Sequence, residues 1–494
     1  MSGTKKSGVK QLSGAQKTGK TQNHNSAQNC FSDARPVSLE EVLSFREEKQ
    51  RIQKSILAKY QAPLLCLGLN IPGEYKRFPL ADRSFQEELS VVRLNLLAEK
   101  IAILHEEFFE SPGGYAAFIS AGGDIKSTGS SSGHMAEIIK EITIRIEETH
   151  TLGRLFDIDV LQPDCKKISR GDCGKKQRPC LICGEDAFAC GRNRTHTVNE
   201  LQASVTGIMR RFQQERLDDV ISAAVIHSLM GEVAVTPKPG LVDRANTGAH
   251  RDMDFFSFID STAVLLPYFR RCAQAGFAKP ENPEALFFSL RPKGKIAELE
   301  MREAVSGANP HRGIIFSIGL ASAAYGALFR NHKHVSAEQV LVYIASMTRT
   351  VLDDFQTPEG ASHGEQIFRQ YGIGGVRAEA RAGFPLVRNC GLPVLRRYLQ
   401  AGYQINDAAL AAFLHLLGTV TDTNIIHRSD PATLAEIQAS VTAFLASNPD
   451  AAAMTTYARQ LDREFIKKNI SPGGCADLLA LSLFLFRLCE VPLI

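Results

Sequence analysis

The chain has 494 residues, which is too long for one ordinary hydrophobic core and predicts two or three domains. Its 44% hydrophobic and 22% charged residues are typical of a globular protein and exclude a collagen-like, wholly disordered or disulfide-scaffold chain. Eleven cysteines, an odd number with one dense group, predict reduced thiols. No signal peptide opens the sequence, so we expect a cytoplasmic protein.

The formal net charge of +4 is concentrated at the N-terminus. Residues 1–35 contain six basic side chains against one aspartate, which leaves the remaining chain slightly acidic. A body so close to neutrality is not typical of proteins that bind phosphate backbones, so we expect no nucleic-acid partner. The Ser-, Gly-, Lys- and Gln-rich segment 1–35 is predicted to be a disordered basic tail.

One long uncharged apolar run, Gly313–Phe329, lies between two arginines. It is shorter than the roughly 20 residues that span a bilayer. We therefore predict a buried helix here and no membrane partner.

The first folded segment begins with a helix and a strand. Ser38 and Glu41 have the spacing of a capping box, which predicts a helix start. The apolar run 62–71 ends in Pro-Gly and predicts a buried strand, and the next helical pattern covers 85–108. Residues 111–133 are rich in Gly and Ser and predict a loop. The pattern of 138–147 fits either a strand or a helix.

Two aspartates alternate with apolar residues in the segment Phe156–Val160. This period of two predicts a strand with Asp157 and Asp159 side by side on one face. Adjacent carboxylates are the ligands that Mg²⁺ prefers, so we expect a magnesium site, although a solvated edge strand would show the same pattern. The turn that leads to Lys76 would suit a phosphate.

A group of cysteines follows, with the spacing Cys180-x₂-Cys183-x₆-Cys190-x₅-His196. Three thiols and an imidazole could close a tetrahedral zinc site. The alternative is a set of reduced cysteines in a basic loop.

From Thr197 onward the sequence has helical periodicity separated by Gly/Pro loops. Thr197 and Glu200 predict another capping box, and we expect an all-α domain from about residue 200. The domain boundary is predicted between Arg192 and Asp218.

Polar groups interrupt this helical region at four places. The segment 231–244 holds Lys238 between two prolines and contains Asp243, with His250 shortly after. Residues 309–313 precede the buried helix, where backbone amides favour anions.

The other two polar groups are carried by helices. The apolar stripe of Val340, Ile344, Met347 and Val351 continues to Asp354, which would place this carboxylate inward as a metal ligand. In 471–477, Ser471 is the predicted N-cap, and two glycines would let a phosphate approach a helix N-terminus. A similar, weaker signal covers 372–379.

The motifs of the two parts of the chain resemble those of two different families. Residues 37–200 resemble apo-citrate lyase phosphoribosyl-dephospho-CoA transferase in Asn70-Ile71-Pro72-Gly73, in Gly153-Arg154-Leu155-Phe156-Asp157-Ile158-Asp159-Val160 and in the cysteine group. Residues 215–494 resemble triphosphoribosyl-dephospho-CoA synthase in Thr236–Asp243, Gly248-Ala249-His250, Gly374–Arg377 and Ser471–Ala480. The chain resembles the fused, bifunctional form.

This resemblance implies a multi-domain chain: a tail (1–35), an α/β (α+β) nucleotidyltransferase-like domain (36–200) and an all-α synthase domain (215–494). It implies that ATP and dephospho-CoA yield triphosphoribosyl-dephospho-CoA and adenine, followed by transfer to a serine of the apo acyl carrier subunit of citrate lyase with release of pyrophosphate. The expected catalytic residues are Asp157, Asp159, Asp243 and Asp354. Mg²⁺ is expected at Asp157, Asp159, Asp354 and Asp477, and structural Zn²⁺ at Cys180, Cys183, Cys190 and His196.

Substrate-binding residues are expected in both domains. They are Lys76, Arg154, Lys238, His250, Asn309, His311, Arg312, Arg377, Glu379, Ser471, Gly473 and Gly474. The chain has Pro310 where the family usually has threonine, so no role is assigned to that position. Two alternatives remain open: the same chemistry on the carrier of malonate decarboxylase, and a zinc-containing nucleic-acid adaptor.

Overall fold

The computed structural model describes residues 34–122, 132–278, 282–330, 332, 334–353 and 363–491. Its contacts divide the chain into two compact units, Met1–Gln213 and Gln214–Ile494, so the protein is multi-domain, as predicted. The predicted tail lies outside the described residues except for its last two positions. Asp354 and most of the Gly/Ser-rich loop also lie outside them.

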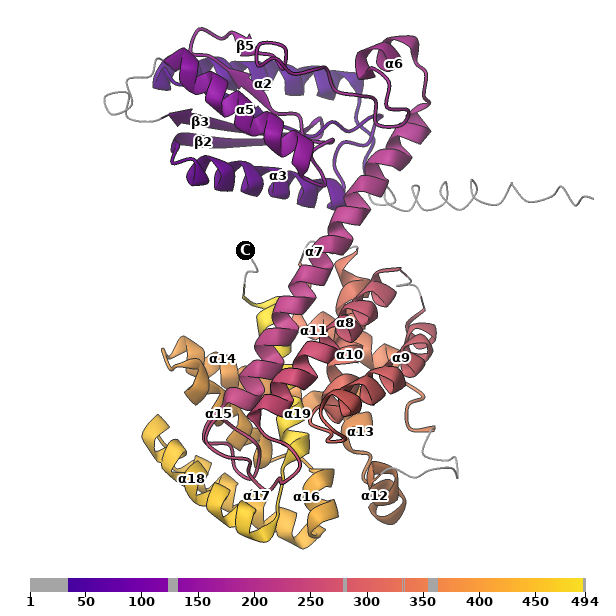
Figure 1. Cartoon of the computed structure of the whole chain (residues 1–494), viewed down its shortest axis with the longest axis vertical. Coiled ribbons are helices and arrows are strands. Elements are labelled where there is room, and N and C mark those ends of the chain that lie inside the picture. Colours follow the sequence, from indigo (N-terminus) through magenta and orange to yellow (C-terminus); the bar gives the residue numbers. More distant parts are fainter. Residues whose placement is uncertain are drawn as a thin grey trace, which may run out of the picture. The chain divides into compact units, whose positions relative to one another are not determined.

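The first unit contains a five-stranded antiparallel sheet with the order β2-β3-β1-β4-β5 (Figure 1). The strands are β1 Leu64–Leu67, β2 Ala102–Ser111, β3 Gly114–Gly122, β4 Asp159–Leu161 and β5 Lys167–Ile168. Helix α2 (Leu39–Tyr60) packs on the face that carries Cys66 and Phe118. Helices α3 (Pro79–Ala98) and α5 (Ser132–Thr149) pack on the other face. The sheet is therefore covered by helices on both faces.

Several predicted elements of this unit are confirmed. Helix α2 begins at the Ser38–Glu41 capping box, with both reciprocal hydrogen bonds formed. Strand β1 lies in the predicted apolar run and is entirely buried. The ambiguous segment 138–147 is helical, as part of α5.

Two predictions were wrong. The helix expected over 85–108 ends at Ala98, and its last residues begin strand β2. The loop expected over 111–133 contains strand β3, which is buried along its whole length. Its Gly, Ala and Ser residues are small because the strand lies between neighbours on both sides and helices on both faces, where little side-chain volume fits.

Helix α7 (Val198–Ala234) contributes to both hydrophobic cores. It begins at the predicted capping box, where Thr197 and Glu200 exchange hydrogen bonds. Its first turns bury Val205 and Phe212 in the first unit. Its later turns bury residues such as Ile221 in the second.

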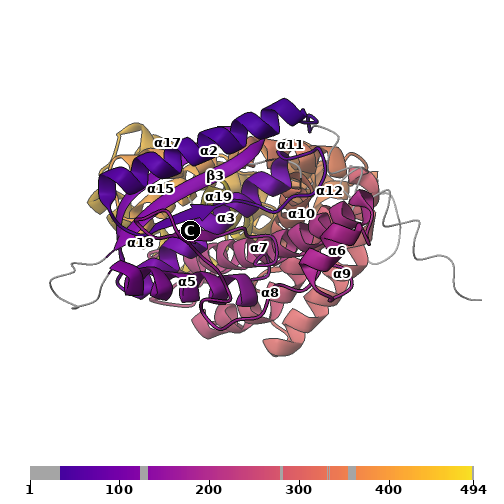
Figure 2. The same ribbon diagram turned by 90° about the horizontal axis from the view of Figure 1, so that it is seen from above.

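All regular elements described in the second unit are helices (Figure 2). After α7 they are α8 Phe255–Ala278, α9 Pro283–Ala304, α10 Arg312–Phe329, α11 Ala337–Met347, α12 His363–Tyr371, α13 Gly375–Arg381, η2 Val387–Gly391, α14 Leu392–Gln400, α15 Ile405–Leu417, α16 Thr423–Arg428, α17 Pro431–Ala446, α18 Ala451–Lys468 and α19 Gly473–Cys489. Helix α10 is long and apolar enough to cross a membrane, but 72% of it is buried inside the protein, as the sequence predicted.

Helices α8 and α10 cross so closely that glycines are required at the contact. A Cβ added to Gly326 would lie 2.0 Å from the carbonyl oxygen of Ala273, and one on Gly276 would lie 1.9 Å from that of Ala323. These carbonyl oxygens belong to the backbone of a helix, so they cannot move aside as the end of a flexible side chain can. These two glycines therefore fix the distance between the helices.

We predict that Gly326→Ala lowers the unfolding free energy of the second unit by about 1–3 kcal/mol, because the new methyl group forces the helices apart. Gly231→Ala is the matched control, since a Cβ there would lie 3.6 Å from the nearest side-chain atom. That helical substitution should leave stability unchanged or raise it by up to about 1 kcal/mol. Thermal and urea unfolding measure both; equal stability of the two variants would contradict the prediction.

Candidate active sites in the two units

In the first unit, the two predicted aspartates lie on the more exposed side of the β4 segment. Phe156, Ile158 and Val160 are buried, whereas Asp157 is exposed and Asp159 is partly exposed. The predicted alternation is thus present, but the regular strand begins only at Asp159. Asp159 forms an ion pair with Lys167 at 2.5 Å.

Three polar contacts fix the backbone around Asp157. Its own N–H donates to the carbonyl of Gly68 at 2.7 Å. The carbonyls on either side accept hydrogen bonds from cations: Arg178 donates to Phe156 at 2.8 Å, and Lys140 donates to Ile158 at 3.1 Å. The backbone that carries Asp157 is therefore held in place by its surroundings.

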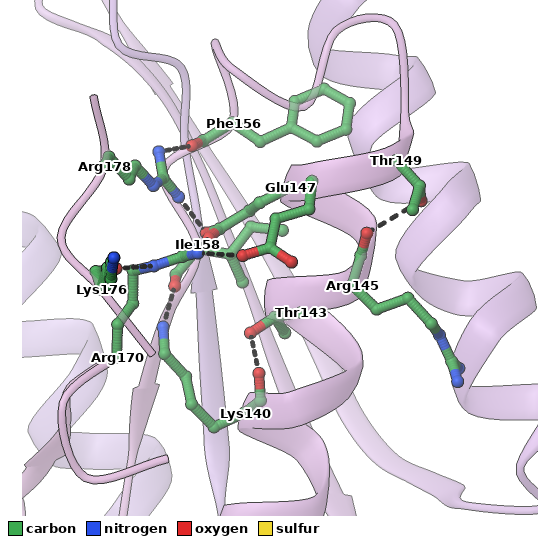
Figure 3. Close-up of polar contacts among 11 residues, drawn as sticks. Lys140, Thr143, Arg145, Glu147, Thr149, Phe156, Ile158, Arg170, Lys176 and Arg178 are labelled. Carbon is green, nitrogen blue, oxygen red and sulfur yellow. Dashed lines mark hydrogen bonds and ion pairs between the residues drawn. The ribbon is translucent and has the colours of Figure 1, made fainter. Parts of the chain in front are cut away.

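A buried carboxylate ties the cysteine segment to this motif. Glu147, near the end of α5, forms ion pairs with both Arg170 and Arg178 (Figure 3). A Cβ on Gly153 would lie 2.4 Å from the carbonyl oxygen of Glu147, so this glycine lets the chain pass close to α5. Burying Glu147 is possible because two guanidinium groups offset its desolvation.

The two cations predicted to bind phosphate in this unit contact backbone carbonyls. Arg154 donates to the carbonyl of Pro179, next to the first cysteine of the cluster. Lys76 is half-buried and donates to the carbonyl of Ile71, and its burial lowers the pKa of the amine.

The four predicted zinc ligands converge. Their ligand atoms all lie within 4.8 Å of one another, with 3.4 Å between the sulfurs of Cys183 and Cys190 and 3.3 Å from Cys183 to His196 Nε2. Backbone N–H groups of Cys183 and Ile182 lower the pKa of Cys180 to about 6. A thiolate at neutral pH is the form that binds metal.

In the second unit, the separated polar motifs meet around one cavity of about 1550 Å³. Most of the predicted substrate-binding and metal-binding residues of this unit line it: Lys238, His250, Asn309, Arg312, Arg377, Glu379, Ser471, Gly473, Gly474 and Asp477. They come from loops and from the first turns of α10, α13 and α19. Segments more than 200 residues apart in the sequence thus form one site.

Three acidic side chains lie close together in this cavity. Burial, and after it the charges of Glu232 and Asp422, raise the pKa of Asp477 well above its usual range. Within the described residues, the Asp477 carboxylate makes no hydrogen bond or ion pair. A Cβ on Gly313 would lie 1.8 Å from its Oδ2, so only glycine fits opposite it. A partly buried carboxylate with acidic neighbours is a natural cation ligand.

Positive side chains lie on other parts of the cavity wall. Lys238 is fully buried and pairs with Glu232. Arg312 lies 3.3 Å from Glu298, and Arg377 lies 3.4 Å from Glu365. The Arg312 side chain can therefore turn to an anionic ligand without breaking a tight ion pair among the described residues.

A histidine and a serine form a direct contact at the cavity. His250 Nε2 lies 2.9 Å from Ser471 Oγ, and its Nδ1 lies 3.8 Å from Asp252. Burial, then the nearby Arg428, lowers the pKa of His250, so the imidazole is neutral at pH 7. Ser471 is not the N-cap of α19, contrary to the prediction, because the helix is preceded by Pro472 in that position.

Two predicted residues of the described chain, Asp243 and His311, do not line the cavity. Asp243 instead organises the 236–246 loop: its carboxylate accepts backbone N–H bonds from Lys238, Ala245 and Asn246 at 3.0, 2.6 and 3.0 Å. His311 is buried, with its Nδ1 2.7 Å from Ser261 Oγ and its Nε2 without a partner among the described residues. Burial lowers the pKa of His311 to about 3.

Asp354, the predicted metal ligand, lies outside the described residues. The predicted stripe of Val340, Ile344, Met347 and Val351 is buried, but α11 ends at Met347. The prediction of one helix continuing to Asp354 was therefore wrong, and a metal-binding role for Asp354 stays a prediction.

Sequence reasoning missed one whole wall of the cavity. The segment from Asp422 to Arg428 forms the N-cap and body of α16, and Asp422, Thr423, Asn424, His427 and Arg428 line the site. Asp422 accepts backbone N–H bonds from Asn424 and from Cys475, at 2.8 and 2.9 Å. The sequence pattern that could have located this wall is an aspartate N-cap followed by His and Arg in a short helix. Glu232, near the end of α7, was also missed.

Comparison with known proteins identifies both units. Residues 218–492 match the family model described as ATP:dephospho-CoA triphosphoribosyl transferase (CitG). Residues 37–212 match the model described as apo-citrate lyase phosphoribosyl-dephospho-CoA transferase (CitX).

Full-length relatives have the same two parts. Protein CitXG of Leuconostoc mesenteroides is 33% identical over 481 residues, which cover 93% of this chain and 98% of that protein. Protein CitXG of Haemophilus influenzae is 32% identical over 471 residues, covering 91% and 96%. A 2-(5''-triphosphoribosyl)-3'-dephosphocoenzyme-A synthase of Klebsiella pneumoniae is 39% identical over 282 residues, covering 56% of this chain and 93% of that protein. The resemblance found in the motifs is confirmed, and the chain belongs to the family of fused CitXG proteins.

Proposed function

We propose that the chain makes and attaches the prosthetic group of citrate lyase. Its second unit converts ATP and dephospho-CoA to 2'-(5''-triphosphoribosyl)-3'-dephospho-CoA and adenine. Its first unit transfers this product to a serine of the apo acyl carrier subunit and releases pyrophosphate. The observation that carries the proposal is the convergence of the synthase motifs around one cavity that holds both acidic and basic side chains.

In the second unit, the 2'-hydroxyl of dephospho-CoA attacks C1' of the ATP ribose. The C1'–N9 bond breaks, its electron pair stays on adenine, and adenine takes up one proton as it leaves, which balances the proton lost by the hydroxyl. Neutral His250 is our candidate to accept the hydroxyl proton, because it lines the cavity and already contacts a hydroxyl, that of Ser471. Arg312 and Arg377 would bind the triphosphate. Asp243, expected to be catalytic, serves in our proposal to hold the loop of Lys238.

The acids of the cavity fit a magnesium ion. The carboxylate of Asp477, without a partner among the described residues and close to Asp422, is the observation that favours a bound cation. Mg²⁺ held there would supply charge neutralisation of the triphosphate.

In the first unit, a serine oxygen of the carrier attacks the α-phosphorus of the substrate. The bond from that phosphorus to the β-phosphate oxygen breaks, pyrophosphate leaves with the electron pair, and the hydroxyl proton goes to solvent. Asp157 and Asp159 would hold Mg²⁺, since their carboxylates share the exposed side of β4 and no described N–H group competes for Asp157. We also propose that the first unit is a nucleotidyltransferase-like domain, that the second unit is an all-α domain, and that the protein is cytoplasmic.

We predict that Asp477→Asn lowers adenine release by at least about 100-fold, because the cavity loses the charge that would hold the metal–triphosphate. Adenine formed from ATP and dephospho-CoA is measured by chromatography. Asp430→Asn is the matched control: that aspartate is an exposed N-cap of α17, and asparagine caps equally well. Unchanged release by Asp477→Asn would remove this residue from the site.

We predict that Asp157→Asn abolishes carrier modification while adenine release continues at the parent rate. Mass spectrometry of the apo carrier detects the modification, and adenine is assayed in the same reaction. Purified carriers of citrate lyase and of malonate decarboxylase, compared side by side, identify the acceptor. Simultaneous loss of both activities would show that the sites are not separable.

We predict one zinc ion at Cys180, Cys183, Cys190 and His196, whose separations fit metal–ligand bonds of about 2.0–2.3 Å. Elemental analysis of the parent protein should find zinc, and Cys183→Ser should lose most of it. Cys165→Ser, an exposed cysteine outside the cluster, is the control and should retain it. A parent protein without zinc after purification in zinc-supplemented medium would rule the site out.

A further inference from the structure

Helix α2 carries two polar side chains on the stripe that faces the sheet. Phe45, Ile52 and Ile56 on this stripe pack against β1 and β3. Lys49 and Gln53 occupy positions of the same stripe, one turn apart, and both are partly buried. An amphipathic helix places apolar residues at such positions unless the polar groups have a use there.

These side chains lie at the part of the sheet that carries Asp159. In the register of the sheet, Cys66 of β1 is the partner of Asp159 on β4. Burial raises the pKa of the Cys66 thiol to about 12, and the side chains of Lys49, Gln53 and Asp159 are close enough to act on it. Lys49, Gln53 and Asp159 therefore surround one point of the sheet.

The positive charge continues along the helix. Arg46 lies one turn before Lys49 and is close enough to Lys76 to lower the pKa of that amine further. Lys49 also acts on Glu88, a buried carboxylate whose strongest charged neighbour is Asp157. Arg46 and Lys49 are thus neighbours on α2, the helix that packs on the sheet face of Cys66 and its strand partner Asp159.

Two of these cations have no protein partner among the described residues. Neither Arg46 nor Lys49 forms a hydrogen bond or an ion pair there, whereas neighbouring Arg51 pairs with Glu48 on the outer side of α2. The partly buried ammonium group of Lys49 pairs with none of the nearby carboxylates. Its positive charge is therefore available to an anion. The strongest candidate anion is a polyphosphate bound together with a divalent cation.

We propose that Arg46 and Lys49 of α2 bind the pyrophosphate part of the triphosphoribosyl substrate in the carrier-modifying site. The proposal rests on the function proposed for the first unit. Lys49 forms and breaks no covalent bond. It stabilises the negative charge that grows on the β-phosphate oxygen as the α-phosphorus transfers to the serine. Gln53 positions the helix over Cys66.

The test uses the full chain with purified triphosphoribosyl-dephospho-CoA and apo carrier. Lys49→Met keeps the aliphatic stem and removes the charge. We expect the KM for the nucleotide and the inhibition constant of inorganic pyrophosphate to rise about tenfold or more, with the KM for the carrier within about twofold. Lys49→Arg should restore most of the affinity. Adenine release by the second unit should not change.

Lys54→Met is the matched control, because Lys54 lies on the exposed side of the same helix. It should leave every constant unchanged. Parental constants for both Lys49→Met and Arg46→Met would overturn the proposal, as would an equal loss in Lys54→Met. If a Lys49 variant does not fold, Arg46→Met decides the outcome, because Arg46 is exposed. Failure of the parent protein to modify the carrier would instead refute the proposed function.

Discussion

Burying a carboxylate is costly unless a nearby partner offsets its lost hydration, and one buried ion pair in each unit meets this requirement. Glu147 is buried in the first unit because Arg170 and Arg178 both reach it. Glu232 is buried in the second unit because Lys238 meets it. Breaking such a pair leaves an uncompensated buried charge, which costs several kcal/mol. The two buried pairs therefore fix the loops on which the proposed sites depend.

In both units, the paired acids stand beside acids that have no such partner within the described part of the chain. Glu147 holds Arg178, which in turn fixes the backbone next to exposed Asp157. Glu232 and Lys238 lie beside Asp477, whose pKa is raised by burial and acidic neighbours. The paired carboxylate has a structural role in each case, and the unpartnered one is available to a metal ion that arrives with phosphates.

The sequence predicted what depends on local patterns and missed what depends on tertiary packing. Capping boxes at Ser38 and Thr197 were predicted, because their hydrogen bonds join residues three apart. Strand β3 was missed, because Gly, Ala and Ser in a central strand reflect neighbours that only the fold supplies. Asp422 was missed for the same reason: its contact with Cys475 joins residues 53 positions apart. Motif membership located the polar loops and helix starts at the cavity but could not separate Asp243, which holds a loop, from Asp477, which faces the cavity.

The two proposed sites differ in how open they are to solvent, and this difference fits the size of the molecules that react there. Dephospho-CoA and ATP are small molecules, which a cavity of about 1550 Å³ can hold. The acceptor of the second reaction is a serine on another protein, which cannot enter such a cavity. Asp157 is accordingly exposed. Its backbone is held by hydrogen bonds that Gly68, Arg178 and Lys140 make with residues 156–158. An open site can thus keep its aspartate on a fixed backbone without enclosing the substrate.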